Sequence, residues 1–325
     1  MFKTTLAALM LANNVTANDL FFSQGNKFYD FGIQSPVNQS PFELIHHPED
    51  LHPHFAATYK PLTSLLKANP QDLATNDHLL DSLLITPRKG YHHLMYDEVI
   101  GLMNTIAAEF PHLVNLESIG KTFDDRDIWM MKIDGTSLLS PSTGLDGQKD
   151  NKAILLTGAH HSREMVSTQM PLYAALDLLH GYTHSDKEKL ALLARNKYFI
   201  IPMLNTDGCH EIMKHWKETG EMLLKRKNND IRFEKPEDNC PLMEKGVDIN
   251  RNYGYIWGND NGPCSESYPG PHAFSEPESR AMRNLLYKYQ DTIKFVYNFH
   301  AFGPMWVWPY NGENVNELAE SNPVA

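Results

Sequence analysis

Three short apolar runs place the strongest limit on how this chain can fold. They span residues 153–159, 198–204 and 293–299. Runs of this length, bounded by turn residues, are typical of strands buried on both faces of a sheet. Stretches of helical character lie between them, and strands that alternate with helices indicate parallel pairing. The pattern therefore predicts an α/β fold with a mixed, largely parallel central sheet flanked by helices.

Local signals place the helices and one hairpin. The helices are expected at 96–110, 168–179 and 275–290. The last of them opens with Ser275 and Glu278 in capping-box register. Two further apolar segments, 113–119 and 128–133, flank a polar turn and predict a hairpin at the edge of the sheet.

The first residues have the pattern of a signal peptide at 1–17. Lys3 precedes an apolar stretch at 6–12, and Val15-Thr16-Ala17 places small residues where a signal peptidase reads. A bilayer needs about 20 consecutive apolar residues, so this stretch is too short to be an anchor. We expect a secreted protein, extracellular or lumenal, with no membrane span.

Residues 18–90 differ in composition and are expected to be an N-terminal extension. Repeated prolines interrupt any periodicity, and four histidines crowd into 46–54, where they either bind metal or form a solvated polar stretch. Arg88-Lys89 ends the segment. This pair is either a protease site that releases a pro-segment or a plain basic linker. Periodic structure follows, which predicts a folded domain at 91–325.

The charge balance excludes one class of partner. The chain has 29 basic and 40 acidic residues, a net charge of −11. Binding to phosphate backbones needs a basic face, so we expect no nucleic acid as a ligand.

Polar residues follow the apolar runs, at the sheet edge where ligands collect in α/β folds. His161 and Glu164 come after the first run and His300 after the third. Two imidazoles and a carboxylate at one edge form the donor set of a catalytic zinc site. A single histidine in such a place is more often a hydrogen-bonded structural residue, but the agreement of several strand ends favours a metal site.

The ordered motifs of this region resemble those of the zinc carboxypeptidase family, the carboxypeptidase A and B type. The resemblance covers roughly Tyr91 to Pro309. The matching motifs are His161-x-x-Glu164, His300, Asn205-Thr206-Asp207-Gly208, Arg226-Lys227-Asn228, Asp248-Ile249-Asn250-Arg251-Asn252 and Cys264-Ser265-Glu266-Ser267-Tyr268 with Gly270. The resemblance implies a catalytic domain at 91–325, one Zn²⁺ held by His161, Glu164 and His300, and peptide or protein C-termini as substrate.

The resemblance also implies roles for other polar residues. Asn250 and Arg251 match a clamp for the terminal carboxylate, which a planar guanidinium binds with two parallel hydrogen bonds. The remaining matches are Arg226 for polarising the scissile carbonyl, Arg163 for contacting the substrate backbone and Asp248 for orienting the first zinc histidine. Seen singly, each arginine would be read as a surface ion pair. The family resemblance further implies a disulfide between Cys240 and Cys264, with Cys209 as a free buried thiol.

Two departures from the family pattern affect the expected activity. Ala301 and Phe302 replace a Ser-Tyr pair that is common after the second zinc histidine, and no glutamate matches the general base. Glu313, Glu317 and Glu320 come too soon after His300. We therefore expect a C-terminally incomplete metallocarboxypeptidase. The alternatives are an inactive zinc-binding fragment or pseudoenzyme that binds peptide C-termini, and a deacylase-like relative, which leaves the Asn250-Arg251 clamp unexplained.

Overall fold

The computed structural model describes residues 94–139, 152–232, 235, 238–255, 257–258, 262–303 and 305–307. The signal peptide expected at 1–17, the extension at 18–90 and the Arg88-Lys89 pair lie outside the described residues. The same holds for the three glutamates after His300.

A five-stranded sheet in the order β1-β2-β4-β3-β5 forms the centre of the molecule. Its strands are β1 (Val114–Lys121), β2 (Asp127–Asp134), β3 (Lys152–Thr157), β4 (Asn196–Ile201) and β5 (Ile293–Asn298). The β1–β2 hairpin lies at one edge and pairs antiparallel, as does β2 with β4. Strand β3 pairs in parallel with β4 on one side and β5 on the other. The mixed α/β sheet expected from the sequence is confirmed. Its parallel pairs join β3, β4 and β5, the strands that the three apolar runs form.

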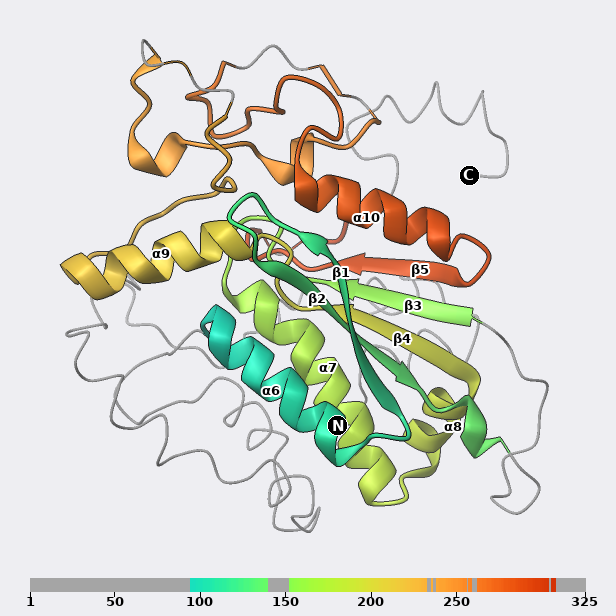
Figure 1. Ribbon diagram of the computed structural model, residues 1–325. Helices are drawn as coiled ribbons and strands as arrows, with labels where there is room; N and C mark the ends of the chain where they lie inside the picture. Colours follow the sequence, from blue (N-terminus) through green and yellow to red (C-terminus); the bar gives the residue numbers. More distant parts are fainter. Residues whose placement is uncertain are drawn as a thin grey trace, which may run out of the picture.

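Helices cover both faces of this sheet. They are α6 (Tyr96–Glu109), α7 (Val166–Thr183), α8 (Lys187–Arg195), α9 (Thr206–Thr219) and α10 (Pro277–Lys288), with short 3-10 turns η2 (Thr136–Leu138), η5 (Leu242–Glu244) and η6 (Ile249–Arg251). Figure 1 shows α6 and α7 on one face and α10 on the other. No helix in the described part of the chain combines the length and apolarity needed to cross a membrane.

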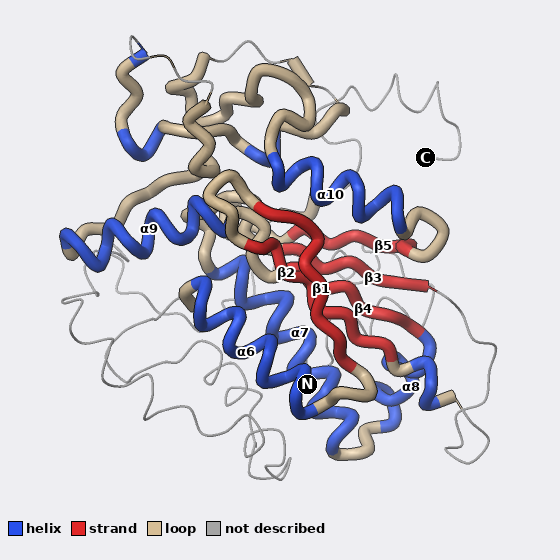
Figure 2. Tube along the Cα trace, in the orientation of Figure 1, coloured by secondary structure: helices blue, strands red, loops and turns tan. Residues whose placement is uncertain are grey.

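Alternation along the central strands builds one core on each face. Ile154 and Leu156 of β3 belong to the core under α6 and α7, whereas Ala153 and Leu155 belong to the core under α10. Successive side chains of a strand point to opposite faces, so an uninterrupted apolar strand serves both layers. The two cores lie on either side of β3 and β4, which run side by side between α7 and α10 (Figure 2).

The structure corrects two expectations and adds two helices. Strand β5 was expected to be buried on both faces, but Phe295 and Val296 are each 51% exposed, because β3 is its one described strand partner. The capping box is wrong: Glu276 is the N-cap of α10, and its side chain caps no backbone N–H. Helices α8 and α9 were not expected, although Asn205 caps α9 by accepting from the Gly208 N–H at 3.0 Å.

Candidate metal centre

The three expected zinc ligands come together at the carboxyl ends of β3 and β5. These strands are parallel neighbours, and their last residues, Thr157 and Asn298, are directly paired. His161 and Glu164 follow β3, and His300 follows β5, so both segments leave the sheet at one edge. Their ligand atoms all lie within 4.8 Å of one another.

The donor atoms of this cluster converge on one point. The His161 Nδ1 atom is 2.8 Å from Glu164 Oε1, and His300 Nδ1 is 2.8 Å from Glu164 Oε2. The two Nδ1 atoms are 3.1 Å apart. Two imidazole nitrogens and a carboxylate with one shared focus form the His₂Glu set of catalytic zinc sites. The residues present therefore fit a zinc ion.

A tight turn sets the geometry of the loop after β3. Ala159 has a φ of 51°, and a Cβ at Gly158 would lie 2.2 Å from the Ser167 carbonyl oxygen. The Ser162 N–H donates to the Arg226 carbonyl at 3.1 Å, which ties this loop to the arginine segment. Glycine at 158 is therefore required by the close approach of the backbone to α7.

The surroundings of the cluster favour the ionised forms of Glu164 and Asp248, and an ionised carboxylate is the form that binds a metal. Burial alone would raise the pKa of Glu164, but hydrogen bonds with His161 and His300 outweigh it and hold that pKa well below its usual range. The Ala301 N–H also donates to Glu164 Oε2 at 3.1 Å. Burial likewise opposes ionisation of Asp248, yet His161 and Arg226 lower its pKa. Both groups remain carboxylates at neutral pH.

Asp248 lies behind His161, as the resemblance implied, and it also pairs with Arg226, which was not expected. Its Oδ1 atom lies 3.3 Å from His161 Nε2, on the side of the ring away from the cluster. Its Oδ2 atom accepts from Arg226 Nε at 2.8 Å. The Asp248 side chain is 0% exposed. A buried carboxylate this close behind a histidine favours one orientation of the ring.

The other two arginines differ in their engagement. Arg163 makes a bidentate pair with Glu266, at 2.7 and 3.1 Å. The sequence did not indicate this pairing, although Glu266 lies inside the motif at 264–268. Arg251 is exposed, and its Nη1 donates to the Asn250 carbonyl at 3.1 Å. The structure thus places Arg226 against Asp248, Arg163 against Glu266, and Arg251 where a ligand can reach it.

Two contacts beside the ligands were missed by sequence reasoning. The His160 Nε2 atom lies 2.9 Å from the Tyr253 hydroxyl, and burial together with His300 and His161 lowers the pKa of His160 to about 3. His160 is therefore neutral and ties the ligand loop to the segment after η6. The Cys209 thiol, 1% exposed, donates to the Ser162 carbonyl at 3.6 Å beneath the same loop.

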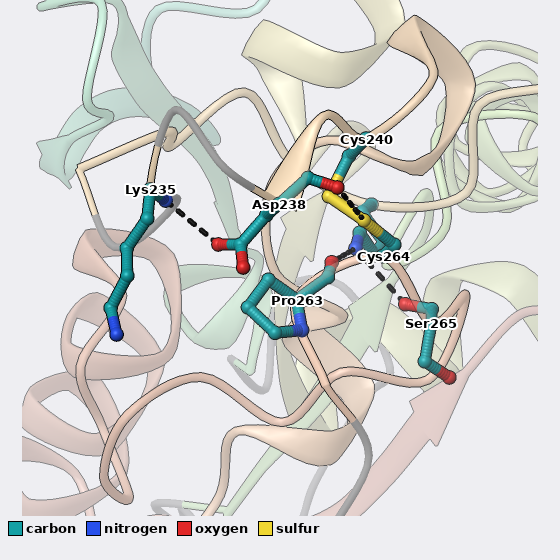
Figure 3. Close-up of a disulfide and its surroundings, with 7 residues drawn as sticks. Lys235, Asp238, Cys240, Pro263, Cys264 and Ser265 are labelled. Atoms are coloured by element: carbon teal, nitrogen blue, oxygen red, sulfur yellow. Dashed lines mark hydrogen bonds between the residues drawn. A yellow bond between two sulfur atoms is a disulfide. The ribbon is translucent and has the colours of Figure 1, made fainter.

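The disulfide implied by the resemblance is present. Cys240 and Cys264 are bonded across a separation of 24 residues, and Cys209 is free and buried. Figure 3 shows the bridge beside Asp238, Pro263 and Ser265. The Lys227 ammonium donates to the carbonyls of Pro263 and Ser265 at 2.5 and 3.0 Å. The bridge and this lysine hold the loop that carries Glu266 close to the segment after Arg226.

Comparison with known proteins agrees with this site. The family profile described as zinc carboxypeptidase matches residues 99–323, which is more than half of the 325-residue chain. The chain belongs to the zinc carboxypeptidase family.

The relatives include both named enzymes and proteins named as inactive. Carboxypeptidase B of Astacus astacus is 26% identical over 228 residues, covering 68% of this chain and 64% of that protein. Inactive metallocarboxypeptidase ECM14 of Ajellomyces dermatitidis is 32% identical over 234 residues, covering 67% of this chain and 36% of that protein. The chain spans less than two thirds of the length of each.

A solved structure has the same fold. Carboxypeptidase A from Helicoverpa armigera matches with a TM-score of 0.56 and 26% identity, covering 76% of this chain and 58% of that one.

Proposed function

We propose that the protein binds one zinc ion through His161, Glu164 and His300. The observation that carries this proposal is the convergence of two Nδ1 atoms and a carboxylate within 4.8 Å, in a chain of the zinc carboxypeptidase family. When bound, zinc would polarise a carbonyl and lower the pKa of a water. The chain's own residues supply the orientation, since Asp248 supports His161 from behind.

Metal analysis of the purified chain tests the zinc site. We expect stoichiometric zinc in the wild type and its loss in a His161→Ala, His300→Ala double variant, because two of three protein ligands are removed. A double variant at His112 and His215, two histidines outside the cluster, is the control and should keep its zinc. Undiminished zinc in the first double variant would contradict the assignment.

We further propose that the site binds the C-termini of peptides or proteins. Arg251 is the exposed cation, and with Asn250 it offers hydrogen-bond donors for a terminal carboxylate. Arg226 lies against Asp248, directed by the carboxylate that also supports His161, and is suited to stabilise charge on a scissile carbonyl. Arg163, which pairs with Glu266, would contact the substrate backbone from the loop that carries His161 and Glu164.

Hydrolysis of the C-terminal peptide bond is the activity that this arrangement supports best. The similarity to Carboxypeptidase B of Astacus astacus favours it. The second candidate is binding without hydrolysis. It is favoured by the similarity to inactive ECM14 and by the carboxylates described at the site, because Glu164, Asp248 and Glu266 each already serve a histidine or an arginine. None of these three is free to act as the general base.

A matched pair of peptides separates the two candidates. Binding and release of the last residue are measured for a peptide with a free C-terminus and for its C-terminal amide, using zinc-loaded protein and an Arg251→Ala variant. Both candidates require a preference for the free carboxylate that Arg251→Ala removes. Release of the terminal residue supports hydrolysis, and tight binding without release supports the second candidate. Equal affinity for acid and amide in the wild type would contradict both.

We propose, finally, that the protein is secreted and that residues 18–90 are removed as a pro-segment. The signal-like pattern at 1–17, the basic pair at Arg88-Lys89 and the Cys240–Cys264 disulfide support this proposal, because disulfides persist in oxidising compartments. N-terminal sequencing of the protein recovered outside cells is the test. A start near Asn18 would mean that the extension is permanent.

A further inference from the structure

Two fully buried asparagines lie next to the two arginines that matter most to the proposed function. Asn228 follows Arg226 by two residues, and Asn252 directly follows Arg251. Both asparagines are 0% exposed. Neither side chain forms a hydrogen bond with His161, Glu164 or His300, and a fully buried side chain does not contact substrate. Their burial must therefore be explained by the hydrogen bonds that they make within the protein.

Asn228 uses every hydrogen-bonding position of its side chain. Its Oδ1 accepts from the Val247 N–H at 2.8 Å and the Asp230 N–H at 3.2 Å. Its Nδ2 donates to Glu276 Oε2 at 2.7 Å and to Glu278 Oε2 at 3.3 Å. The Asn228 N–H also donates to the Val247 carbonyl at 3.0 Å. This residue joins the Arg226 segment to the residue before Asp248.

The side chain of Asn252 also uses both its amide nitrogen and its amide oxygen in hydrogen bonds, in this case with the residues that precede and begin α10. Its Nδ2 donates to the carbonyls of Pro269 and His272 at 2.8 and 3.1 Å, and lies 2.7 Å from Ser275 Oγ. Its Oδ1 accepts from the Glu276 N–H at 3.1 Å and from Ser279 Oγ at 2.6 Å. The residue after Arg251 is thereby held against the segment that leads into α10.

The start of α10 connects the two asparagines. The Ser275 hydroxyl donates to Glu276 Oε1 at 2.7 Å, while Oε2 of the same carboxyl accepts from Asn228. A continuous path of hydrogen bonds therefore runs from Asn228 through Glu276 and Ser275 to Asn252. Helix α10 is itself packed on the sheet through Ala281, Met282 and Leu285, which belong to the core that contains Leu155 of β3. The path is thus anchored to the strand that leads into the metal ligands.

Only an amide satisfies both ends of this path. Aspartate has nearly the same shape as asparagine, but its carboxylate donates no hydrogen bond. At position 252 it would face the carbonyls of Pro269 and His272, and at position 228 it would face Glu276 and Glu278. At position 252 buried acceptors would then face each other without a proton, and at position 228 a third carboxyl would join the buried Glu276 and Glu278; both arrangements are strongly unfavourable. The requirement at both positions is for donors as well as acceptors.

We propose that Asn228 and Asn252 are positioning residues, which fix Arg226 and Arg251 relative to each other through the hydrogen-bond path at the start of α10. This inference rests on the proposed binding of peptide C-termini. It assigns the two residues different effects. Asn252 governs recognition of the terminal carboxylate through Arg251. Asn228 positions Arg226, which is proposed to contact the scissile carbonyl. Because acid and amide peptides both have this carbonyl, Asn228 affects the binding of both alike.

The test measures dissociation constants of zinc-loaded protein for a peptide with a free C-terminus and for its amide. In Asn252→Asp we expect the preference for the acid to fall by about 10- to 100-fold, the effect of displacing a binding group by roughly 1 Å. In Asn228→Asp we expect both peptides to bind more weakly with the preference retained. Asn104→Asp, an exposed asparagine of α6, introduces the same charge and should change neither value.

Zinc stoichiometry and the thermal unfolding transition are recorded for each variant. If Asn252→Asp does not fold, Ser275→Ala removes one link of the path and should lower the preference in the same direction by a smaller factor. A folded, zinc-bound Asn252→Asp or Ser275→Ala protein with wild-type preference would overturn the positioning role while leaving the clamp intact. A wild-type protein that binds acid and amide equally would instead overturn the clamp, and the positioning role with it.

Discussion

Strands β3 and β5 are neighbours that contribute to the same site in opposite surroundings. They pair in parallel, with Leu155 directly opposite Val296. Leu155 is 0% exposed and Val296 is 51% exposed. The ligands that follow repeat this contrast, since the side chain of His161 is 4% exposed and that of His300 is 25% exposed. The two histidines proposed as metal ligands therefore differ in burial.

The contrast extends to the groups behind each ligand. His161 has Asp248 behind it, a buried carboxylate that also binds Arg226. His300 has Asn298, whose Nδ2 lies 3.0 Å from His300 Nε2 at an exposed position. The β3 side of the site is organised by buried contacts of the protein itself, whereas the β5 side relies on fewer contacts. This difference makes the two halves separable by experiment.

The largest expected effect concerns the paired positions in the two strands. Leu155→Ala should lower the free energy of unfolding by about 2–5 kcal/mol, because it leaves a cavity in the core under α10. Val296→Ala, directly opposite, should cost less than about 1 kcal/mol, as expected at an exposed strand position. Urea unfolding of the two variants provides the measurement. Equal losses would show that β5 is covered in solution and would remove the contrast.

The groups behind the histidines should differ next most. Asp248→Asn should weaken zinc binding by about 10- to 100-fold, since it removes the charge that orients His161. Asn298→Ala should weaken it by less than about tenfold, because the lost contact is exposed. Competition with a chelator of known affinity measures both variants. A larger effect at Asn298 would reverse the assignment of the organised half.

Burial in the first turn of α10 should also produce a dependence on pH. Burial raises the pKa of Glu278 to about 8, with the neighbouring Glu276 and Asp207 adding to the shift. The folded state therefore holds this proton more tightly than the unfolded chain does. The stabilisation is complete below the ordinary glutamate pKa near 4.5 and is lost as pH rises to about 8.

Replacement of this group isolates its contribution. Glu278→Gln keeps an acceptor for the Asn228 amide but cannot ionise, so its melting temperature should fall less between pH 5 and about 9 than that of the wild type. Glu117→Gln, at a carboxyl paired with lysines near the surface, serves as the control. An unchanged slope in Glu278→Gln would mean that another group titrates in this range.

The smallest effect is expected at the exposed ion pair. Glu266→Gln breaks the bidentate contact with Arg163, but Glu266 is 50% exposed, and such pairs contribute between zero and about 1 kcal/mol. The free energy of unfolding should therefore change by less than about 1 kcal/mol. Denaturant unfolding at low and moderate salt checks this value. A loss comparable to that of Leu155→Ala would show that the pair supports the ligand loop.

Sequence reasoning was most successful where the pattern is local. The three apolar runs predicted β3, β4 and β5, and the polar residues after them predicted the cluster of His161, Glu164 and His300, because parallel strands end at one edge. The exposure of β5 was not predictable, since an apolar strand has the same pattern whether or not a neighbour covers it. The failed cap at Ser275 has a related cause. Long-range bonds from Asn228 and Asn252 engage the start of α10, and local register does not contain them.

The buried thiol of Cys209 can report on local opening of the structure around the loop that carries His161 and Glu164. It is the one free cysteine of the chain, it donates to the Ser162 carbonyl, and burial raises its pKa to about 12. A thiol in this state reacts with an alkylating reagent only while the structure that covers it is open, and the two cysteines of the disulfide do not react. The labelling rate of the native protein therefore reports how often the structure that covers Cys209, which includes the segment between His161 and Glu164, opens; no engineered probe is needed.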